Sequence, residues 1–240
     1  MSANPEEFPG QIVVKNLLKR YHTRPVLNQL SINIDAGALC ILVGDNGVGK
    51  TTLLRILAGL VRPDSGEISI GNSGSTRGPQ HRRIIGYLGH QSMLYQDLNA
   101  VENLTHYARL YQLPQVEMIV SESIISVGLE KSQYQMVRTY SRGMQQRLSI
   151  ARSLLHDPQV LLLDEPYTGL DKQGAQFLDK RLKSLHQQGK TILLAAHRPH
   201  RLISFASHVA WLKDGVIAEY SPVKEIPGNP QLAAYLQESA

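Results

Sequence analysis

The chain has 240 residues, of which 42% are hydrophobic, and its formal net charge is +5. This length and composition suffice for one large packed unit or two small ones that fold without covalent staples. The lone cysteine, Cys40, excludes an internal disulfide framework and fits a reducing compartment, whereas the mild positive charge is compatible with nucleic acid, an anionic membrane face, phosphates or simply a basic surface.

The N-terminal segment MSANPEEFPG has neither a basic start nor an apolar stretch. Along the whole chain, no run reaches the roughly 18 apolar residues that a membrane-spanning helix needs. We therefore expect a cytoplasmic protein whose residues 1–10 form a flexible tail.

Two short runs of alternating apolar residues follow, at 12–18 and 26–34. They flank a short polar turn, and this arrangement predicts a pair of antiparallel strands. The run from Ala38 to Val43 is apolar throughout, which is typical of a strand buried on both faces of a sheet. Because Cys40 lies within this run, we expect it to be a buried, unreactive thiol.

The next segments predict a helix, a strand, a loop and a helical region. A helix is expected from about Lys50 to Leu60, and the following RPDSGEISI predicts a turn that leads into a strand. Residues 71–83 are rich in Gly, Ser and Arg and predict an exposed loop. No convincing strand pattern occurs from about 99 to 156, so we expect an all-helical insertion there.

The last third of the chain returns to an alternation of strands and helices. A helix over about 172–188 carries Ala175, Leu178, Leu182 and Leu185 on one face. Asp214 and Gly215 predict a hairpin turn between the last two strands. The expected strands of this part are 160–163, 191–196, 208–213 and 216–220. The alternation along the chain predicts an α/β fold.

The strongest chemical signal follows the buried strand and reads GDNGVGKTT, residues 44–52. It matches the phosphate-binding loop pattern, with the required strand before it and helix after it. Glycines let successive backbone N–H groups converge on phosphate oxygens, Lys50 adds a positive charge, and Thr51 offers a hydroxyl to Mg²⁺. The nucleotide-binding residues expected here are Gly44, Asn46, Gly47, Gly49, Lys50, Thr51 and Thr52.

A second chemical signal is VLLLDEP, residues 160–166, an apolar strand that ends in two carboxylates. Asp164 can orient a magnesium-bound water, and Glu165 can polarise the water that attacks a phosphate. A strand that ends in an acidic turn is common and is weak evidence by itself. Together with the phosphate loop, however, it predicts a site that hydrolyses a nucleotide.

The order of GDNGVGKTT, GHQ, YSRGMQQR, VLLLDEP, TGLD and AAH resembles the ATP-binding subunit of ABC transporters over nearly the whole chain. YSRGMQQR is similar to the signature motif of that family. The resemblance implies a phosphate-loop NTPase core of the RecA type, with an N-terminal antiparallel β-subdomain and a helical insertion. It also implies ATP hydrolysis with Mg²⁺.

Several further residues receive roles from this resemblance. Gln91 matches a glutamine that reaches Mg²⁺ and the attacking water, and His197 looks like a histidine that contacts the γ-phosphate. Tyr21 is placed like an aromatic residue that stacks on adenine, and Asp171 looks like an aspartate of the loop at the dimer interface. Simpler alternatives are a surface strand tyrosine at position 21 and an ordinary loop residue at position 91.

The signature segment departs from the usual family pattern of Leu, Ser, Gly, Gly and Gln. Tyr140, Arg142 and Met144 replace three of its residues, while Ser141 and Gly143 remain. Those two supply a hydroxyl and unobstructed backbone N–H groups at an expected helix start, which suits a γ-phosphate. Arg142 is expected either to point away from the phosphate path or to touch the nucleotide from its side.

The resemblance implies that two ATP-binding subunits meet head to tail, with ATP between the phosphate loop of one and the signature of the other. The expected single ABC domain comprises 11–92 and 158–240 as β-subdomain and core, and 93–157 as the helical subdomain. Separate transmembrane permease subunits are implied as partners, which places the chain on the cytoplasmic face of the cell membrane.

The segment YLGHQSMLYQDLNAVENLTHYARLY is similar to the ATPase of the bacterial haem exporter used in cytochrome c maturation. A multidrug or lipid exporter ATPase is an alternative, as is a soluble ABC protein of translation, DNA repair or iron-sulfur cluster assembly. We expect no direct binding to nucleic acid, because translation and repair members usually carry two cassettes or long insertions. A phosphate-loop kinase is a further alternative, which Ser141 and Gly143 argue against.

Overall fold

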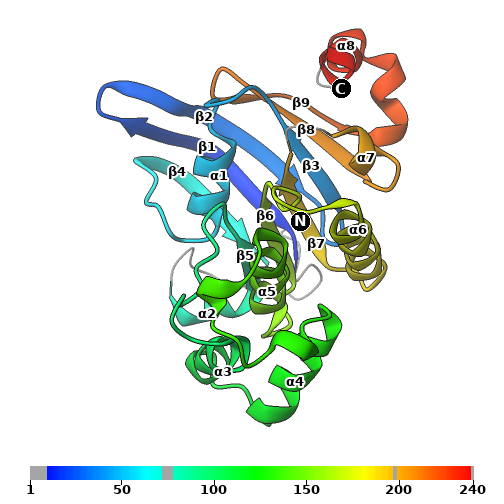
Figure 1. Ribbon diagram of the computed structural model, residues 1–240. Coiled ribbons are helices and arrows are strands. Elements are labelled where there is room, and N and C mark those ends of the chain that lie inside the picture. Colours follow the sequence, from blue (N-terminus) through cyan, green and yellow to red (C-terminus); the bar gives the residue numbers. More distant parts are fainter. Residues whose placement is uncertain (1–9, 72–77, 197–198, 239–240) are drawn as a thin grey trace.

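The computed structural model describes residues 10–71, 78–196 and 199–238 of the chain. Its centre is a mixed sheet with five parallel strands and one antiparallel edge strand (Figure 1). The strand order across the sheet is β5 (Ile85–Leu88), β6 (Val160–Asp164), β7 (Thr191–Ala195), β3 (Leu39–Val43), β8 (His208–Lys213) and β9 (Val216–Pro222). This arrangement confirms the predicted α/β fold.

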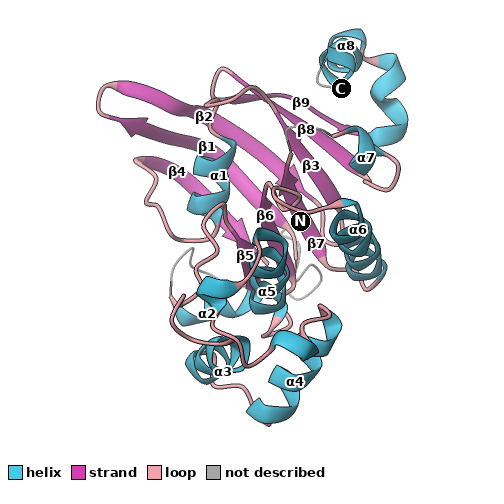
Figure 2. Cartoon of the chain, in the orientation of Figure 1, coloured by secondary structure: helices cyan, strands magenta, loops and turns pink. Residues whose placement is uncertain are grey.

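A second, antiparallel sheet is formed by the N-terminal strands and lies beside the central sheet (Figure 2). The predicted strand pair is present, but its hairpin is longer than the sequence pattern indicates, because pairing continues to Tyr21 and Arg24. The strand order is β2 (Arg24–Ile34), β1 (Ile12–Tyr21) and β4 (Ser65–Ile70). This antiparallel sheet packs against one face of the central sheet.

The central strand β3 shows how the core is divided. Cys40 and Leu42 pack among residues of the antiparallel sheet and of α1 (Lys50–Leu57), whereas Leu39, Ile41 and Val43 pack on the opposite face. All five residues of β3 are buried, as expected for a strand covered on both sides. Burial raises the pKa of the Cys40 thiol far above its ordinary value, so the thiol is protonated and inert.

Helices cover the second face of the central sheet. The predicted apolar face of α6 (Lys172–Gln187) is confirmed, because Leu178, Leu182 and Leu185 are buried there. Two further helices add buried residues to the same face, Leu202 from α7 (His200–Ile203) and Leu232 and Leu236 from α8 (Pro230–Glu238), and α7 lies nearer to α6 than α8 does (Figure 1). The predicted hairpin turn between β8 and β9 is also present, with Asp214 and Gly215 both at positive φ.

The region from Asn99 to His156 is helical as predicted, apart from an isolated bridge between Asn99 and Met136. Asn99 and Glu102 form a capping box that fixes the first helix of this region. The apolar faces of the helices build a separate small core that includes Leu104, Ile124 and Leu148. The helices are α3 (Ala100–Leu110), α4 (Val116–Ser126) and α5 (Arg142–Leu154).

The structure differs from the expected local structure in three places. Within the expected loop 71–83, Pro79–Ile84 forms helix α2, because Pro79 is at the start and His81 is buried with its Nε2 2.8 Å from the Leu57 carbonyl oxygen. Helix α8 was not expected, although Leu232 and Leu236 pack into the core four residues apart. Gly10, assigned to the flexible tail, is buried.

Candidate functional site

The phosphate loop connects β3 to α1 and has the backbone geometry that its glycines permit. Gly44 and Gly49 have φ angles of 151° and 118°, a conformation that residues with a side chain rarely adopt. A Cβ on Gly49 would lie 2.8 Å from the Leu27 side chain, so the antiparallel sheet also packs directly against the loop. Sequence and packing therefore both require glycine at this position.

Lys50 begins α1, and its side chain folds back into the loop. Its Nζ donates hydrogen bonds to the carbonyl oxygens of Gly44, at 2.5 Å, and Asp45, at 3.0 Å. Burial lowers the pKa of Lys50, whereas the charges of Glu165 and Asp164 oppose that shift. The loop thus holds a buried cation whose partners are backbone oxygens, which phosphate oxygens can replace.

Asp164, the last residue of β6, lies next to the beginning of α1. The Thr51 hydroxyl donates a hydrogen bond of 3.1 Å to Asp164 Oδ1. Asp164 Oδ2 is buried and has no hydrogen-bond partner among the described residues. Burial raises the pKa of this carboxyl, while the hydrogen bond from Thr51 opposes the rise. One oxygen of the pair is therefore available to a cation.

Glu165 turns away from the strand that carries Asp164. Its φ of 52° is unusual for a residue with a side chain, and its backbone N–H donates a 3.0 Å hydrogen bond to the Ala195 carbonyl oxygen of β7. Glu165 lines a hollow of about 140 Å³, and its other lining residues all belong to the phosphate loop and the start of α1: Asn46, Gly47, Gly49, Lys50, Thr51 and Thr52. The turn thus places Glu165 at the edge of the phosphate-loop hollow.

Ser141 and Asp171 each cap a helix at the surface. Ser141 Oγ accepts a 3.3 Å hydrogen bond from the Met144 N–H of α5, and Asp171 Oδ1 accepts one of 2.7 Å from the Gly174 N–H of α6. Both residues line one hollow of about 430 Å³, together with Gly143. This hollow shares no lining residue with the one at the phosphate loop.

Arg142 faces a different direction from its neighbours Ser141 and Gly143. It lines a third hollow, of about 290 Å³, together with Asp164 and Glu165. Arg142 therefore borders a hollow that two carboxylates of its own chain also line.

The other residues assigned from the resemblance do not line any of these three hollows in the part of the chain that the structure describes. Tyr21 ends β1 with 45% of its surface exposed, and Lys19 Nζ lies 5.5 Å from its ring centre. Gln91 lies exposed in the loop after β5 and is not among the residues that line the three hollows. His197 lies outside the described residues.

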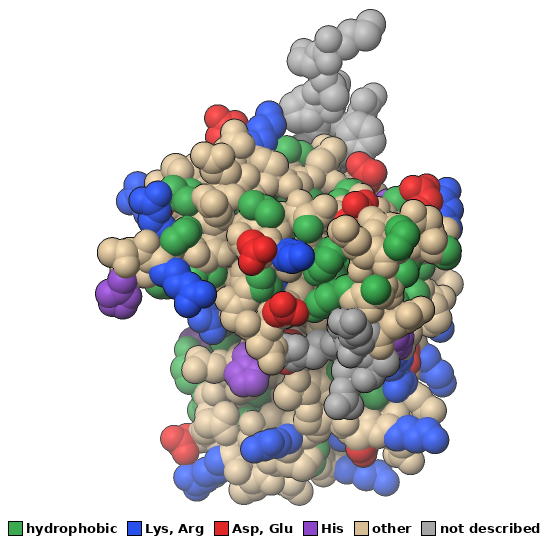
Figure 3. Space-filling view, turned by 90° about the horizontal axis from the view of Figure 1, so that it is seen from above, with side chains coloured by type: hydrophobic (Ala, Val, Ile, Leu, Met, Phe, Trp, Pro, Cys, Tyr) green, Lys and Arg blue, Asp and Glu red, His purple; other side chains and the backbone are tan. Residues whose placement is uncertain are grey.

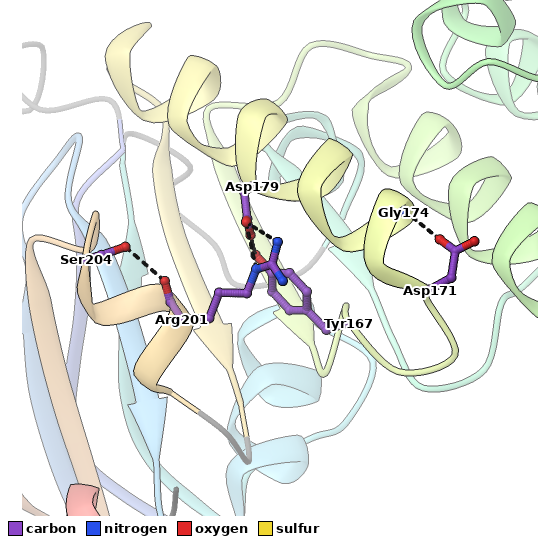
Figure 4. A network of polar contacts seen from close by, with 6 residues as sticks. All are labelled: Tyr167, Asp171, Gly174, Asp179, Arg201 and Ser204. Carbon is purple, nitrogen blue, oxygen red and sulfur yellow. Dashed lines mark hydrogen bonds and ion pairs between the residues drawn. The ribbon is translucent and has the colours of Figure 1, made fainter.

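Sequence reasoning missed a set of polar contacts around the segment that follows Asp164 and Glu165. Gln146 of α5 donates a 2.7 Å hydrogen bond to the carbonyl oxygen of Pro166, which connects the signature helix to the segment after Glu165. Asp179 accepts hydrogen bonds from Tyr167 and Arg201 (Figure 4). The sequence contains no signal for this triple contact, because Asp179 and Arg201 lie 22 residues apart on different elements.

Fold and site together define a phosphate-loop nucleotide-binding protein. The chain matches the sequence model of the ABC transporter family over residues 27–168. It is 40% identical to the cytochrome c biogenesis ATP-binding export protein CcmA of Xylella fastidiosa, over 80% of this chain and 90% of that protein. It is 36% identical to the Nod factor export ATP-binding protein I of Cupriavidus metallidurans, over 87% and 70%.

Solved structures give the same family. An ATP-binding subunit of an ABC transporter superimposes with a TM-score of 0.84 at 26% identity, covering 94% of this chain and 99% of that one. A dimeric ATP-binding cassette in a post-hydrolysis state, bound to ADP and phosphate, gives 0.80 at 27% identity, covering 88% and 98%. The chain belongs to the ABC transporter family and is an ATPase of the ABC type.

Proposed function

We propose that two copies of this chain, or this chain and a related subunit, bind ATP between the phosphate loop of one and the signature of the other. The observation that carries this proposal is the division of the motif residues between two hollows. Lys50 and Glu165 line one, whereas Ser141, Gly143 and Asp171 line another. A second copy, opposed head to tail, would bring the two halves together.

The residues around Asp164 fit a magnesium ion. A buried carboxylate oxygen without a partner, beside a threonine hydroxyl, is an arrangement that a hard cation with oxygen ligands satisfies. Thr51 and Asp164 would hold the ion, with Gln91 as a further ligand once its loop closes. Bound there, Mg²⁺ would neutralise charge on the β- and γ-phosphates of ATP.

In this proposal Glu165 is the base that orients and activates the attacking water. Glu165 lines the phosphate-loop hollow, as a base that acts on water near a bound phosphate must do. Gln91 and His197 are assigned supporting catalytic roles, at the water and the γ-phosphate respectively. Tyr21 is assigned to adenine stacking, for which its exposed ring at the end of β1 is suited. The phosphate contacts of Gly44, Asn46, Gly47, Gly49 and Thr52 belong to the same proposal.

We further propose that the chain works on the cytoplasmic face of a membrane, attached to separate permease subunits. Among the described residues, none of the helices combines the length and hydropathy needed to span a bilayer. The helical region 93–157 is proposed as the subdomain that carries the signature, and 11–92 with 158–240 as the β-subdomain and core. Together they would form one ABC domain.

The proposed cargo is haem, exported for the maturation of c-type cytochromes. Two relatives of 40% and 39% identity are named as cytochrome c biogenesis export proteins, and each is covered over at least 85% of its length. Export of other compounds is the alternative, because a Nod factor export protein is 36% identical. Co-purification with haem-exporter membrane subunits supports the first assignment, whereas normal c-type cytochrome assembly in a clean deletion strain contradicts it.

Nucleic acid is not a proposed partner. On the face shown in Figure 3, Lys and Arg side chains are dispersed and interleaved with acidic and apolar ones rather than gathered into a stripe. Salt-dependent binding of RNA or DNA to the purified chain would overturn this part of the proposal.

The two-copy site is tested by ATP-dependent dimerisation of the Glu165→Gln variant, compared with the double variant that also carries Ser141→Arg. We expect the first to dimerise with ATP and the second to remain monomeric, because the arginine side chain would occupy the γ-phosphate position. Equal dimerisation of both variants would return Ser141 to the role of a helix cap.

A further inference from the structure

Tyr167, Asp179 and Arg201 form a compact polar cluster next to the catalytic segment (Figure 4). The Tyr167 hydroxyl donates a 2.7 Å hydrogen bond to Asp179 Oδ1. Arg201 donates to Asp179 Oδ2 through Nε, at 2.7 Å, and through Nη2, at 2.5 Å. Both oxygens of the carboxylate therefore have donors, one from each side.

The three residues come from three separate elements around the site. Tyr167 lies in the turn two residues after Glu165, Asp179 lies in the middle of α6, and Arg201 belongs to α7. The Arg201 guanidinium also lies 5.9 Å from the centre of the Tyr167 ring. The cluster thus connects the turn after the proposed base to two helices that pack on the central sheet.

Other contacts also hold this turn, among them the hydrogen bond that Gln146 donates to the Pro166 carbonyl oxygen. Two local backbone hydrogen bonds fold it into successive turns. The Thr168 N–H donates to the Glu165 carbonyl oxygen, and the Leu170 N–H donates to that of Tyr167. Glu165, Tyr167 and Arg201 line a hollow of about 500 Å³, so one flank of the turn lacks close neighbours. Side-chain hydrogen bonds therefore act together with the packing of Tyr167 and Leu170 on the core to fix the turn.

We propose that Tyr167, Asp179 and Arg201 are positioning residues for ATP hydrolysis, which hold the turn between Glu165 and Asp171 in its productive geometry. The inference rests on the proposed catalytic role of Glu165. Asp171, which starts α6, lies in the hollow of the signature residues, so the turn that the cluster holds connects Glu165 of one half of the proposed site to Asp171 of the other. The cluster touches neither the phosphate-loop hollow nor the expected nucleotide, and it acts through the turn.

Protonation of Tyr167 is compatible with this role at neutral pH. Burial, together with the hydrogen bond to Asp179, raises the pKa of the phenol well above its ordinary value. The hydroxyl therefore remains a donor at neutral pH and well above it.

The test compares the steady-state ATPase activity of Tyr167→Phe and Arg201→Lys with that of the wild type. Tyr167→Phe removes one hydroxyl and leaves the ring, and Arg201→Lys keeps the charge but loses the two-point contact. We expect kcat to fall about 3- to 10-fold in each variant, with the KM for ATP within twofold, because the base is displaced while the phosphate loop is intact. An unchanged kcat in both variants would overturn the proposal.

A double variant and a matched control separate positioning from stability. If both residues act through Asp179, Tyr167→Phe combined with Arg201→Lys should lower kcat by less than the product of the two single effects. Asp157→Asn breaks the ion pair between Asp157 and Lys190, at 2.8 Å, at the opposite end of β6. We expect this control to retain wild-type kcat, and an equal loss there would mean that the cluster merely stabilises the fold.

The Glu165→Gln variant distinguishes failure of this inference from failure of the proposed function. If Glu165→Gln abolishes hydrolysis while Tyr167→Phe and Arg201→Lys retain it, Glu165 is the base and the cluster is not a positioning device. If Glu165→Gln hydrolyses ATP at the wild-type rate, the catalytic assignment itself is wrong, and the positioning role is overturned with it.

Discussion

The phosphate-loop hollow and the signature hollow differ most in how far their residues are buried. Lys50 and Asp164 are 6% and 2% exposed, and both are hydrogen-bonded within the chain. Ser141 and Asp171 are exposed and cap the first turns of surface helices. The first site is therefore organised within one chain, whereas the second consists of helix N-termini exposed at the surface.

The largest loss of ATPase activity should come from a change in the phosphate-loop hollow, which is the more buried of the two. In Lys50→Ala the loop loses the cation that balances phosphate charge, and we expect ATPase activity to fall by at least about 100-fold. The loss should appear in ATP binding as well as in turnover, measured by equilibrium binding and phosphate release. Lys131→Ala, at an exposed position, is the control that should retain activity. Full activity of Lys50→Ala would remove the contrast between the two hollows.

Glu165→Gln should affect turnover alone. The amide cannot accept a proton from water, so we expect hydrolysis to fall about 100-fold while ATP affinity changes less than about threefold. Phosphate release and nucleotide binding, measured on the same sample, separate these quantities. Wild-type turnover would show that this carboxylate does not activate water.

Thr51→Val should affect the dependence on magnesium. Removal of the hydroxyl deletes one proposed metal ligand and also the hydrogen bond to Asp164. We expect the magnesium concentration for half-maximal activity to rise about tenfold, corresponding to roughly one lost polar contact to a charged group. A magnesium titration identical to that of the wild type would contradict the assignment of Thr51 and Asp164.

Ser141→Ala separates the helix cap from the proposed contact with a second subunit. Loss of the cap should lower the free energy of unfolding by about 1 kcal/mol, because the Met144 N–H loses its acceptor. Asp171→Ala removes a comparable cap on α6 and should have an effect of similar size. Urea denaturation of the isolated chain measures both. A loss in unfolding free energy well above about 1 kcal/mol would indicate that Ser141 has structural contacts beyond the cap.

A different kind of effect, on the pH dependence of stability, is expected at His156, just beyond the other end of α5. His156 stacks on Tyr111 at 3.9 Å, and burial lowers the pKa of this histidine from 6.5 to about 4. The unfolded chain then binds a proton that the folded chain excludes, so stability is full above pH 6.5 and falls as pH drops toward 4. The slope should be up to about 1.4 kcal/mol per pH unit. His156→Phe should reduce this slope in urea denaturation, and an unchanged slope would contradict the burial effect.

Patterns between neighbouring residues in the sequence predicted much of the phosphate-loop site and of the fold. Continuous apolar runs marked β3 and β6, and the glycine spacing marked the loop, because both depend on neighbours in sequence. Helix α2 and helix α8 were missed because their positions depend on contacts such as that of His81 with Leu57. The long hairpin to Tyr21 was likewise fixed by pairing rather than by pattern.

The relation between the site residues could not be read from the sequence. Ser141 was correctly expected at a helix start, but the opposite direction of Arg142 depends on how α5 packs against the turn after Glu165. The contact among Tyr167, Asp179 and Arg201 also needed three elements in space. Spacing along the chain identifies residues of local motifs, whereas long-range polar contacts depend on tertiary structure.

The most direct test of the two-copy site is a complementation experiment. Lys50→Ala and Ser141→Arg should each be inactive alone, since every site in a homodimer then lacks one half. In a 1:1 mixture, pairs that contain both variants have one intact site, so ATPase activity should recover to roughly a quarter of the wild-type value. Activity that remains equal to the sum of the two separate variants would contradict a site shared between two copies.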